Sequence, residues 1–162
     1  MFTISRSVCI DAPASKVWQV LSQLESIHLW VEPIRHSYCE GSTTRGRDAV
    51  RVCELGGNLK VRETIVDWIE GRSFAYAGEG APLTKRAVNR WTVEERGSQS
   101  LVTTTAEVAL KGGICGRLLE PLFAAVAGRM GVRSLAGLKF YVENGTPYQG
   151  NARRLLPKPA TC

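Results

Sequence analysis

The chain has 162 residues, of which 44% are hydrophobic and 22% are charged. This length predicts one domain that buries a core without a metal or disulfide, and the composition excludes disordered and fibrous proteins. The formal net charge of +6 comes from residues 111–162, which hold eight basic and two acidic residues, whereas residues 1–110 hold 13 of each sign. Such an asymmetry can indicate contact with nucleic acid or an anionic membrane.

The sequence has no pattern typical of a membrane span or a secretory signal. Its longest stretch without a charged residue, residues 97–106, is ten residues long, whereas a membrane-spanning helix needs about 20. Residues 1–6 lack the basic segment and apolar run of a signal peptide. The five cysteines are odd in number and have no C-x-x-C spacing. We therefore expect reduced thiols in a cytoplasmic protein, with neither a disulfide framework nor a zinc site, and interpret Cys115 as structural.

The first part of the chain predicts one strand followed by two short helices. Residues 2–11 alternate weakly between apolar and polar side chains, which predicts a strand. Pro13 suits the first turn of a helix over about 13–24, because the missing N–H is not needed there. A second short helix over about 25–31 ends before Pro33.

The middle of the chain predicts strands separated by glycine turns. The glycine pair at 56–57 is a strong hairpin signal, and turns every 8–12 residues indicate antiparallel neighbours. Together we expect six strands between the short helices and a long C-terminal helix. The clearest runs are residues 47–55, 58–69, 72–77, 86–95 and 101–110.

After the glycines at 112–113 the apolar period becomes helical. We expect Pro121 to separate a short first turn from a long helix over 121–144. Such a helix spans about 36 Å, close to the length of a ten-residue strand, so it can lie along the concave face of a sheet. Five larger residues fall near one face of this helix: Leu119, Phe123, Val126, Met130 and Tyr141.

The order of elements predicts an α+β fold. Strands and helices do not alternate, which disfavours a parallel, doubly wound sheet. We expect a seven-stranded antiparallel sheet around the C-terminal helix, forming one domain over residues 1–144. The proline-containing residues 145–162 predict an extended tail.

Three segments resemble the START-like, or SRPBCC, helix-grip superfamily. They are APASKVWQVLSQLESIHLWVEPI at residues 12–34, VDWIEGRSFAY at 66–76, and the glycine turn and helix at 112–143 with GLKFYVE near its end. Within the superfamily, the sequence resembles the polyketide cyclase/dehydrase-like branch. The resemblance implies a helix-grip fold that encloses an apolar ligand cavity between the sheet and the long helix.

Two polar residues are predicted to face this interior. Asn89 alternates with apolar Ala87 and Trp91, so we expect its amide to bond a ligand, a water or a neighbouring strand. Glu63 lies between Val61 and Ile65 at period two, which predicts an inward carboxylate unless a bulge turns it to solvent. Either residue could serve a ligand or be satisfied by the protein itself.

Aromatic and sulfur-containing side chains complete the candidate ligand site. Such side chains suit a hydrophobic ligand, although they fit an ordinary core equally well. The full set of candidate ligand-binding residues is Trp30, Glu63, Tyr76, Asn89, Trp91, Phe123, Met130 and Tyr141. His28 has Glu25 and Glu32 at helical spacing, but we interpret these as a solvated helix face and expect no metal.

Three hypotheses for function follow. The first is binding, with possible transport, of a hydrophobic or amphipathic small molecule such as a lipid or polyketide. The second is a cyclase, dehydratase or aromatase that uses Glu63, Tyr76 or Asn89 for acid–base chemistry. The third is weak contact with an anionic membrane or acidic protein through the basic residues Arg129, Arg133, Arg153, Arg154 and Lys158. Because no phosphate-loop, dinucleotide or nucleic-acid motif is present, we expect no cofactor and no nucleic-acid partner.

Overall fold

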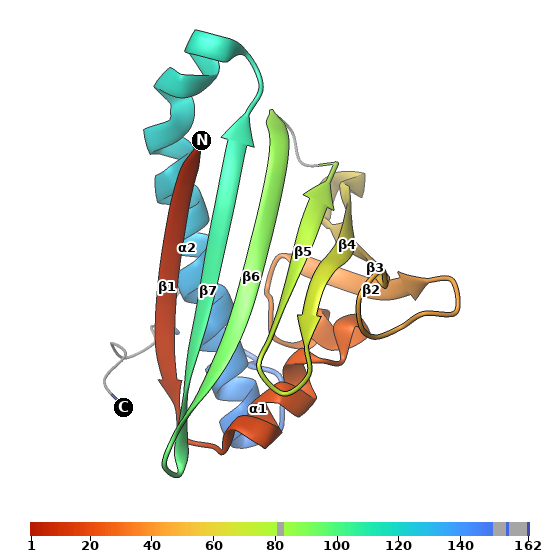
Figure 1. The fold of residues 1–162 in the computed structure, drawn as a ribbon, viewed down its shortest axis with the longest axis vertical. Coiled ribbons are helices and arrows are strands. Elements are labelled where there is room, and N and C mark those ends of the chain that lie inside the picture. Colours follow the sequence, from red (N-terminus) through yellow and green to blue (C-terminus); the bar gives the residue numbers. More distant parts are fainter. Residues whose placement is uncertain (81–82, 151–154, 156–161) are drawn as a thin grey trace.

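The computed structural model describes residues 1–80, 83–150, 155 and 162, without the side chains of residues 114, 115 and 117. Figure 1 shows the strands side by side, with the last helix running along them. The elements in chain order are β1 (Phe2–Ile10), α1 (Ala14–Leu21), the 3-10 helix η1 (Leu24–Leu29), β2 (Ile34–Glu40), β3 (Val50–Leu55), the 3-10 turn η2 (Gly56–Asn58), β4 (Lys60–Ile69), β5 (Ser73–Glu79), β6 (Thr84–Arg96), β7 (Gln99–Leu110) and α2 (Gly113–Asn144).

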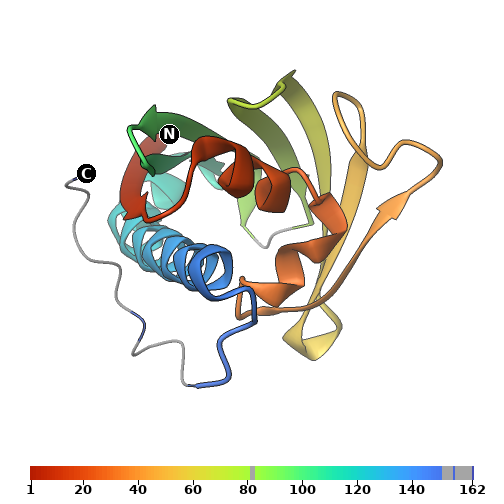
Figure 2. The same cartoon turned by 90° about the horizontal axis from the view of Figure 1, so that it is seen from below.

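The seven strands form one antiparallel sheet in the order β1-β7-β6-β5-β4-β3-β2. Strands β2 to β7 follow one another as a meander, and β1 forms the edge of the sheet next to β7. The sheet curves, and α1, η1 and α2 lie on its concave side (Figure 2). The predicted α+β class and the seven-stranded sheet around a long C-terminal helix are therefore confirmed.

Helix α2 is longer than the sequence predicted, because it starts at Gly113 and continues through Pro121. At about 1.5 Å per residue, its 32 residues span about 48 Å. The expected apolar face was wrong as far as residue 130, because Leu119, Val126 and Met130 are exposed. The second half supplies the buried contacts instead. None of the described helices is long and apolar enough to cross a membrane.

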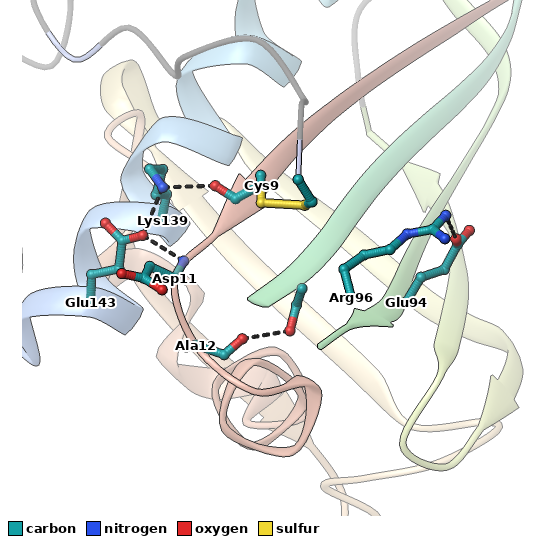
Figure 3. Close-up of a disulfide and its surroundings, with 9 residues drawn as sticks. Cys9, Asp11, Ala12, Glu94, Arg96, Lys139 and Glu143 are labelled. Atoms are coloured by element: carbon teal, nitrogen blue, oxygen red, sulfur yellow. Dashed lines mark hydrogen bonds and ion pairs between the residues drawn. A yellow bond between two sulfur atoms is a disulfide. The ribbon is translucent and has the colours of Figure 1, made fainter. Parts of the chain in front are cut away.

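Close contacts fix the second half of α2 against the start of the chain. Gly137 packs directly on the backbone of Trp30, where a Cβ would lie 2.0 Å from the carbonyl oxygen. Lys139 Nζ donates to the carbonyl of Cys9 at 2.7 Å, and Glu143 accepts from the backbone N–H of Asp11 at 2.8 Å (Figure 3). These contacts hold α2 at the end of β1.

A disulfide joins Cys9 to Cys162, with Cα atoms 5.4 Å apart (Figure 3). The expectation that all cysteines are reduced was wrong for this pair. The two residues are 153 positions apart, and they meet because Cys162 returns to β1, which no local spacing in the sequence indicates. Cys39 and Cys53 are free thiols. The side chain of Cys115 and most of the predicted tail lie outside the described residues.

The contact at Gly137 predicts a difference between two glycines of α2. Gly137→Ala should lower the free energy of unfolding by about 1–3 kcal/mol, because the new methyl group overlaps the Trp30 backbone. Gly131→Ala is the matched control, since a Cβ there would meet only ordinary contacts at 3.7 Å. It should raise stability by up to about 1 kcal/mol through helix propensity. Urea unfolding would measure the free energy of unfolding of both variants. Equal stability of the two would contradict the close packing of Gly137 on Trp30.

Candidate functional site

A cavity of about 300 Å³ lies between the concave face of the sheet and α2. Its walls are mostly apolar and come from η1, all seven strands and α2. Small residues on facing elements leave the space open, including Ala87 and Ala106 on the sheet and Ala127 and Gly131 on the helix. The cavity expected between sheet and helix is therefore present.

A buried ion pair stands at one wall of the cavity. Arg51 Nε donates to Glu63 Oε2 at 2.7 Å, and Arg51 Nη2 lies 2.6 Å from the same oxygen without hydrogen-bond geometry. Arg51 Nη1 also donates to the carbonyl of Leu24 at 3.3 Å. The side chains of Arg51 and Glu63 are 1% and 10% exposed. Two charges this deeply buried are stable only as a pair.

The β3–β4 hairpin creates this pair. The strands are paired symmetrically about Gly57, so that Arg51 on β3 stands directly opposite Glu63 on β4. Directly paired residues point to the same face of a sheet, and here that face is the interior. The β4–β5 register shifts only between Ile65 and Asp67, after Glu63. The predicted inward orientation of Glu63 is therefore correct, and the bulge that could have reversed it lies further along the strand.

Arg51 was missed by the sequence analysis. It lies between Val50 and Val52 in a short strand, where a charged residue is usually read as solvent-facing. The available signal was the glycine pair of the hairpin, because reflection about Gly57 places position 51 opposite position 63.

A row of polar side chains continues from the ion pair across the next strands. The guanidinium of Arg51 lies over the ring of Tyr76 on β5, with Cζ 5.2 Å from the ring centre. Asn89 on β6 donates from Nδ2 to the Tyr76 hydroxyl at 3.0 Å. Thr104 on β7 donates to Asn89 Oδ1 at 3.0 Å. Asn89 is thus satisfied by neighbouring strands, one of the outcomes expected from sequence.

The environment determines which of these groups carry charge. Burial, and then the charge of Glu63, raises the pKa of the Cys53 thiol to about 12. The same two causes raise the pKa of the Tyr76 phenol above its ordinary value. Burial disfavours the charge of Arg51, but Glu63 outweighs this and holds the pKa of the guanidinium above its ordinary range. At neutral pH, Cys53 and Tyr76 are therefore protonated and Arg51 is charged.

The structure brings five of the eight candidate residues to the cavity wall. These are Glu63, Tyr76, Asn89, Trp91 and Met130.

Three candidates do not line the cavity. Trp30 is buried against Trp91, with ring centres 5.5 Å apart in an edge-to-face arrangement. Tyr141 packs on the hydrophobic core, and Phe123 lies half-buried on the first half of α2. Cavity-facing and core-facing aromatic residues have the same sequence pattern, so sequence could not separate them.

The histidine candidate forms contacts with the protein itself. His28 Nδ1 lies 2.8 Å from Ser37 Oγ and 2.9 Å from the Glu25 carbonyl. The Glu25 carboxylate accepts from the backbone N–H of Cys39 at 3.1 Å. Among the described residues, no group of three or more His, Cys, Asp or Glu side chains could hold a metal.

The ion pair predicts a non-additive pair of substitutions. Glu63→Leu leaves Arg51 buried without a partner, so the free energy of unfolding should fall by about 3–5 kcal/mol. The double variant R51M/E63L removes both charges and should recover most of this loss. Glu40→Leu is the control, because it removes the exposed Glu40–Arg62 pair and should cost less than about 1 kcal/mol. Urea unfolding measures the wild type and the three variants. A double variant no more stable than Glu63→Leu would contradict the coupling.

Comparison with solved structures identifies the fold. The Zhui aromatase/cyclase from a Streptomyces species is 16% identical, with a TM-score of 0.75 over 88% of this chain and 93% of that chain. A START superfamily protein from Mycobacterium smegmatis is 17% identical, with a TM-score of 0.72 over 89% and 99%. A protein from Thermobifida fusca is 24% identical, with a TM-score of 0.69 over 88% and 96%. At these identities the likeness shows the helix-grip fold alone.

Sequence comparison identifies the family. None of the curated proteins matches this chain. The family model for "Polyketide cyclase / dehydrase and lipid transport" proteins matches residues 1–143, from β1 almost to the end of α2. Because the match includes all seven strands and the helix that they surround, this chain belongs to the polyketide cyclase/dehydrase and lipid transport family.

Proposed function

We propose that the protein binds, and can carry, a hydrophobic or amphipathic small molecule such as a lipid or polyketide in the cavity between sheet and α2. The observation that carries the proposal is the mostly apolar cavity of about 300 Å³. Ligand pockets start at about this volume and combine apolar walls with a few fixed polar groups. The family match supports the same function. A cytoplasmic location stays a prediction.

The polar row would orient the ligand within the apolar walls. Tyr76, Asn89 and Thr104 are linked by hydrogen bonds, so their positions are fixed before a ligand enters. A polar group on the ligand could approach this row while its apolar part contacts Ala87 and Val108. Such preorganisation reduces the entropy lost on binding.

Filling the cavity should weaken ligand binding. Ala106 lines the cavity on β7, whereas Ala109 on the same strand has the opposite parity and does not line it. Ala106→Phe should weaken binding of the neutral apolar dye Nile red at least about tenfold, because its ring occupies the ligand space. Ala109→Phe adds the same ring outside the cavity and should leave the affinity unchanged. Fluorescence titration measures the dissociation constants.

Native mass spectrometry of protein purified from its own cells provides an independent measurement. We expect a bound small molecule on the wild type and its loss on Ala106→Phe. A wild-type protein that is empty and also ignores Nile red and a lipid panel would contradict the proposed function.

A catalytic role for the cavity is the alternative hypothesis. Glu63 and Tyr76 both line the cavity, as an enzyme would require. However, Glu63 is engaged by Arg51, and the Tyr76 hydroxyl already accepts from Asn89. A ligand would have to exchange these contacts before either group could transfer a proton. We therefore favour ligand binding over catalysis as the function of the cavity.

The first half of α2 supports a second candidate function, contact with an anionic membrane. Leu118, Leu122, Val126 and Met130 recur at intervals of four residues and form an exposed apolar stripe, in which Leu118 is 77% and Leu122 63% exposed. Exposed apolar rows of this kind are typical of interaction surfaces.

The charges around the stripe favour an anionic lipid surface as its partner. Residues 111–142 contain one acidic residue, Glu120, which is paired with the amino group of Met1. Lys111 and Arg129 are exposed at the surface. Met130 belongs both to the stripe and to the cavity wall, which would bring the cavity close to the membrane. The predicted basic contacts Arg153, Arg154 and Lys158 lie outside the described residues.

Vesicle flotation tests this contact. The wild type should float with phosphatidylcholine vesicles that contain phosphatidylglycerol at low salt, and should bind less without the anionic lipid. Leu122→Glu should abolish flotation, because it places a negative charge in the stripe. Ile69→Glu is the control, since Ile69 is an exposed apolar residue at the end of β4. Failure of the wild type to float at low salt would end the membrane hypothesis.

A further inference from the structure

A surface groove of about 550 Å³ adjoins the cavity. Its banks are the segment from Glu32 to Arg35, the β3–β4 hairpin and α2. Pro33, Leu55, Met130 and Ser134 line both the groove and the cavity. A ligand with its apolar part in the cavity could therefore place its other end in the groove.

Two arginines line this groove, one on β2 and one on α2. Arg35 on β2 lies against Gly56, where a Cβ would stand 3.4 Å from Arg35 Nη2. Arg133 on α2 is half-buried in the groove wall. Within the described part of the chain, neither guanidinium has a hydrogen bond or ion pair. The groove is lined by one acidic residue, Glu32, which is exposed and also unpaired among those residues.

These arginines differ from the buried Arg51, which is neutralised by Glu63. A guanidinium stays charged at any physiological pH and presents several N–H donors in a fixed plane. Arg133 is half-buried, whereas Arg35 is exposed. A guanidinium without a partner can bind a carboxylate or phosphate, because charge-assisted hydrogen bonds are roughly twice as strong as neutral ones.

We propose that the groove binds the anionic headgroup, carboxylate or phosphate, of an amphipathic ligand whose apolar part occupies the cavity. The inference rests on the proposed binding function. It narrows the ligand from hydrophobic molecules in general to amphiphiles with one anionic end. Arg35 and Arg133 both bind the headgroup, and the negative charge of Glu32 weakens its binding.

Displacement of Nile red by three ligands that share one alkyl chain and differ in their headgroup tests this proposal. Dodecanoate and dodecyl phosphate carry the headgroup charge, and dodecanol lacks it. The wild type should bind the two anions about tenfold more tightly than the alcohol, as expected for one charge-assisted hydrogen bond of about 1.4 kcal/mol or more. Inorganic phosphate alone should displace no dye, because a headgroup site does not reach the cavity.

Four single substitutions assign the preference to the groove. Arg133→Gln and Arg35→Gln should each lower the affinity for the two anions about fivefold or more. The affinity for dodecanol should stay within about twofold of the wild-type value. Glu32→Gln should have the opposite effect and raise the affinity for the anions, because it removes a negative charge that repels the headgroup. Arg72→Gln is the matched control, since Arg72 is exposed in the turn at the other end of β4. Unchanged Nile red affinity would show that each variant is folded.

The outcomes separate this inference from the function on which it rests. Equal affinity of the wild type for the anions and the alcohol, or an anion preference that survives in R35Q/R133Q, would overturn the headgroup site and leave the cavity function intact. Failure of Nile red and all three ligands to bind the wild type would overturn both.

Discussion

The buried ion pair between Arg51 and Glu63 is the constraint on which the interior depends. Neither charge can remain in an apolar interior alone, so β3 and β4 must take the register that joins them. That register decides which residues face inward, and a slip by one position would turn every side chain of a strand to the other face. Cys53 and Leu55 then reach the cavity wall together with Glu63. The ion pair therefore also determines which other residues line the cavity.

Helix α2 divides its length between two physical roles. In the second half, Gly137 allows backbone contact with Trp30, and Leu135, Leu138 and Val142 are buried. In the middle of the helix, the small residues Ala127 and Gly131 line the cavity, and larger apolar residues from Leu118 to Met130 are exposed. The turns from Leu135 onward therefore anchor the helix, and the turns from Ala127 to Ser134 border the ligand space. A continuous close-packed helix would leave no room for a ligand.

Much of the fold was predictable because strand alternation and turn glycines act locally. They placed Glu63 and Asn89 on the inner face correctly, before any partner was known. The partner of Glu63 was harder, since Arg51 becomes its neighbour only through cross-strand register. The outward face of α2 could not be predicted, because an apolar stripe at helical spacing normally indicates burial. The cavity wall and the core likewise use the same residue types, which is why Trp30 and Tyr141 were assigned to the ligand.

The bond between Cys9 and Cys162 makes the chain a covalent ring of 154 residues. In the chain-entropy account, closing a ring of this size removes enough freedom from the unfolded chain to stabilise the fold by roughly 5 kcal/mol. The ring closes at the end of β1, where Lys139 also binds. Redox conditions can therefore change the stability of the folded protein, because reduction of this bond opens the ring.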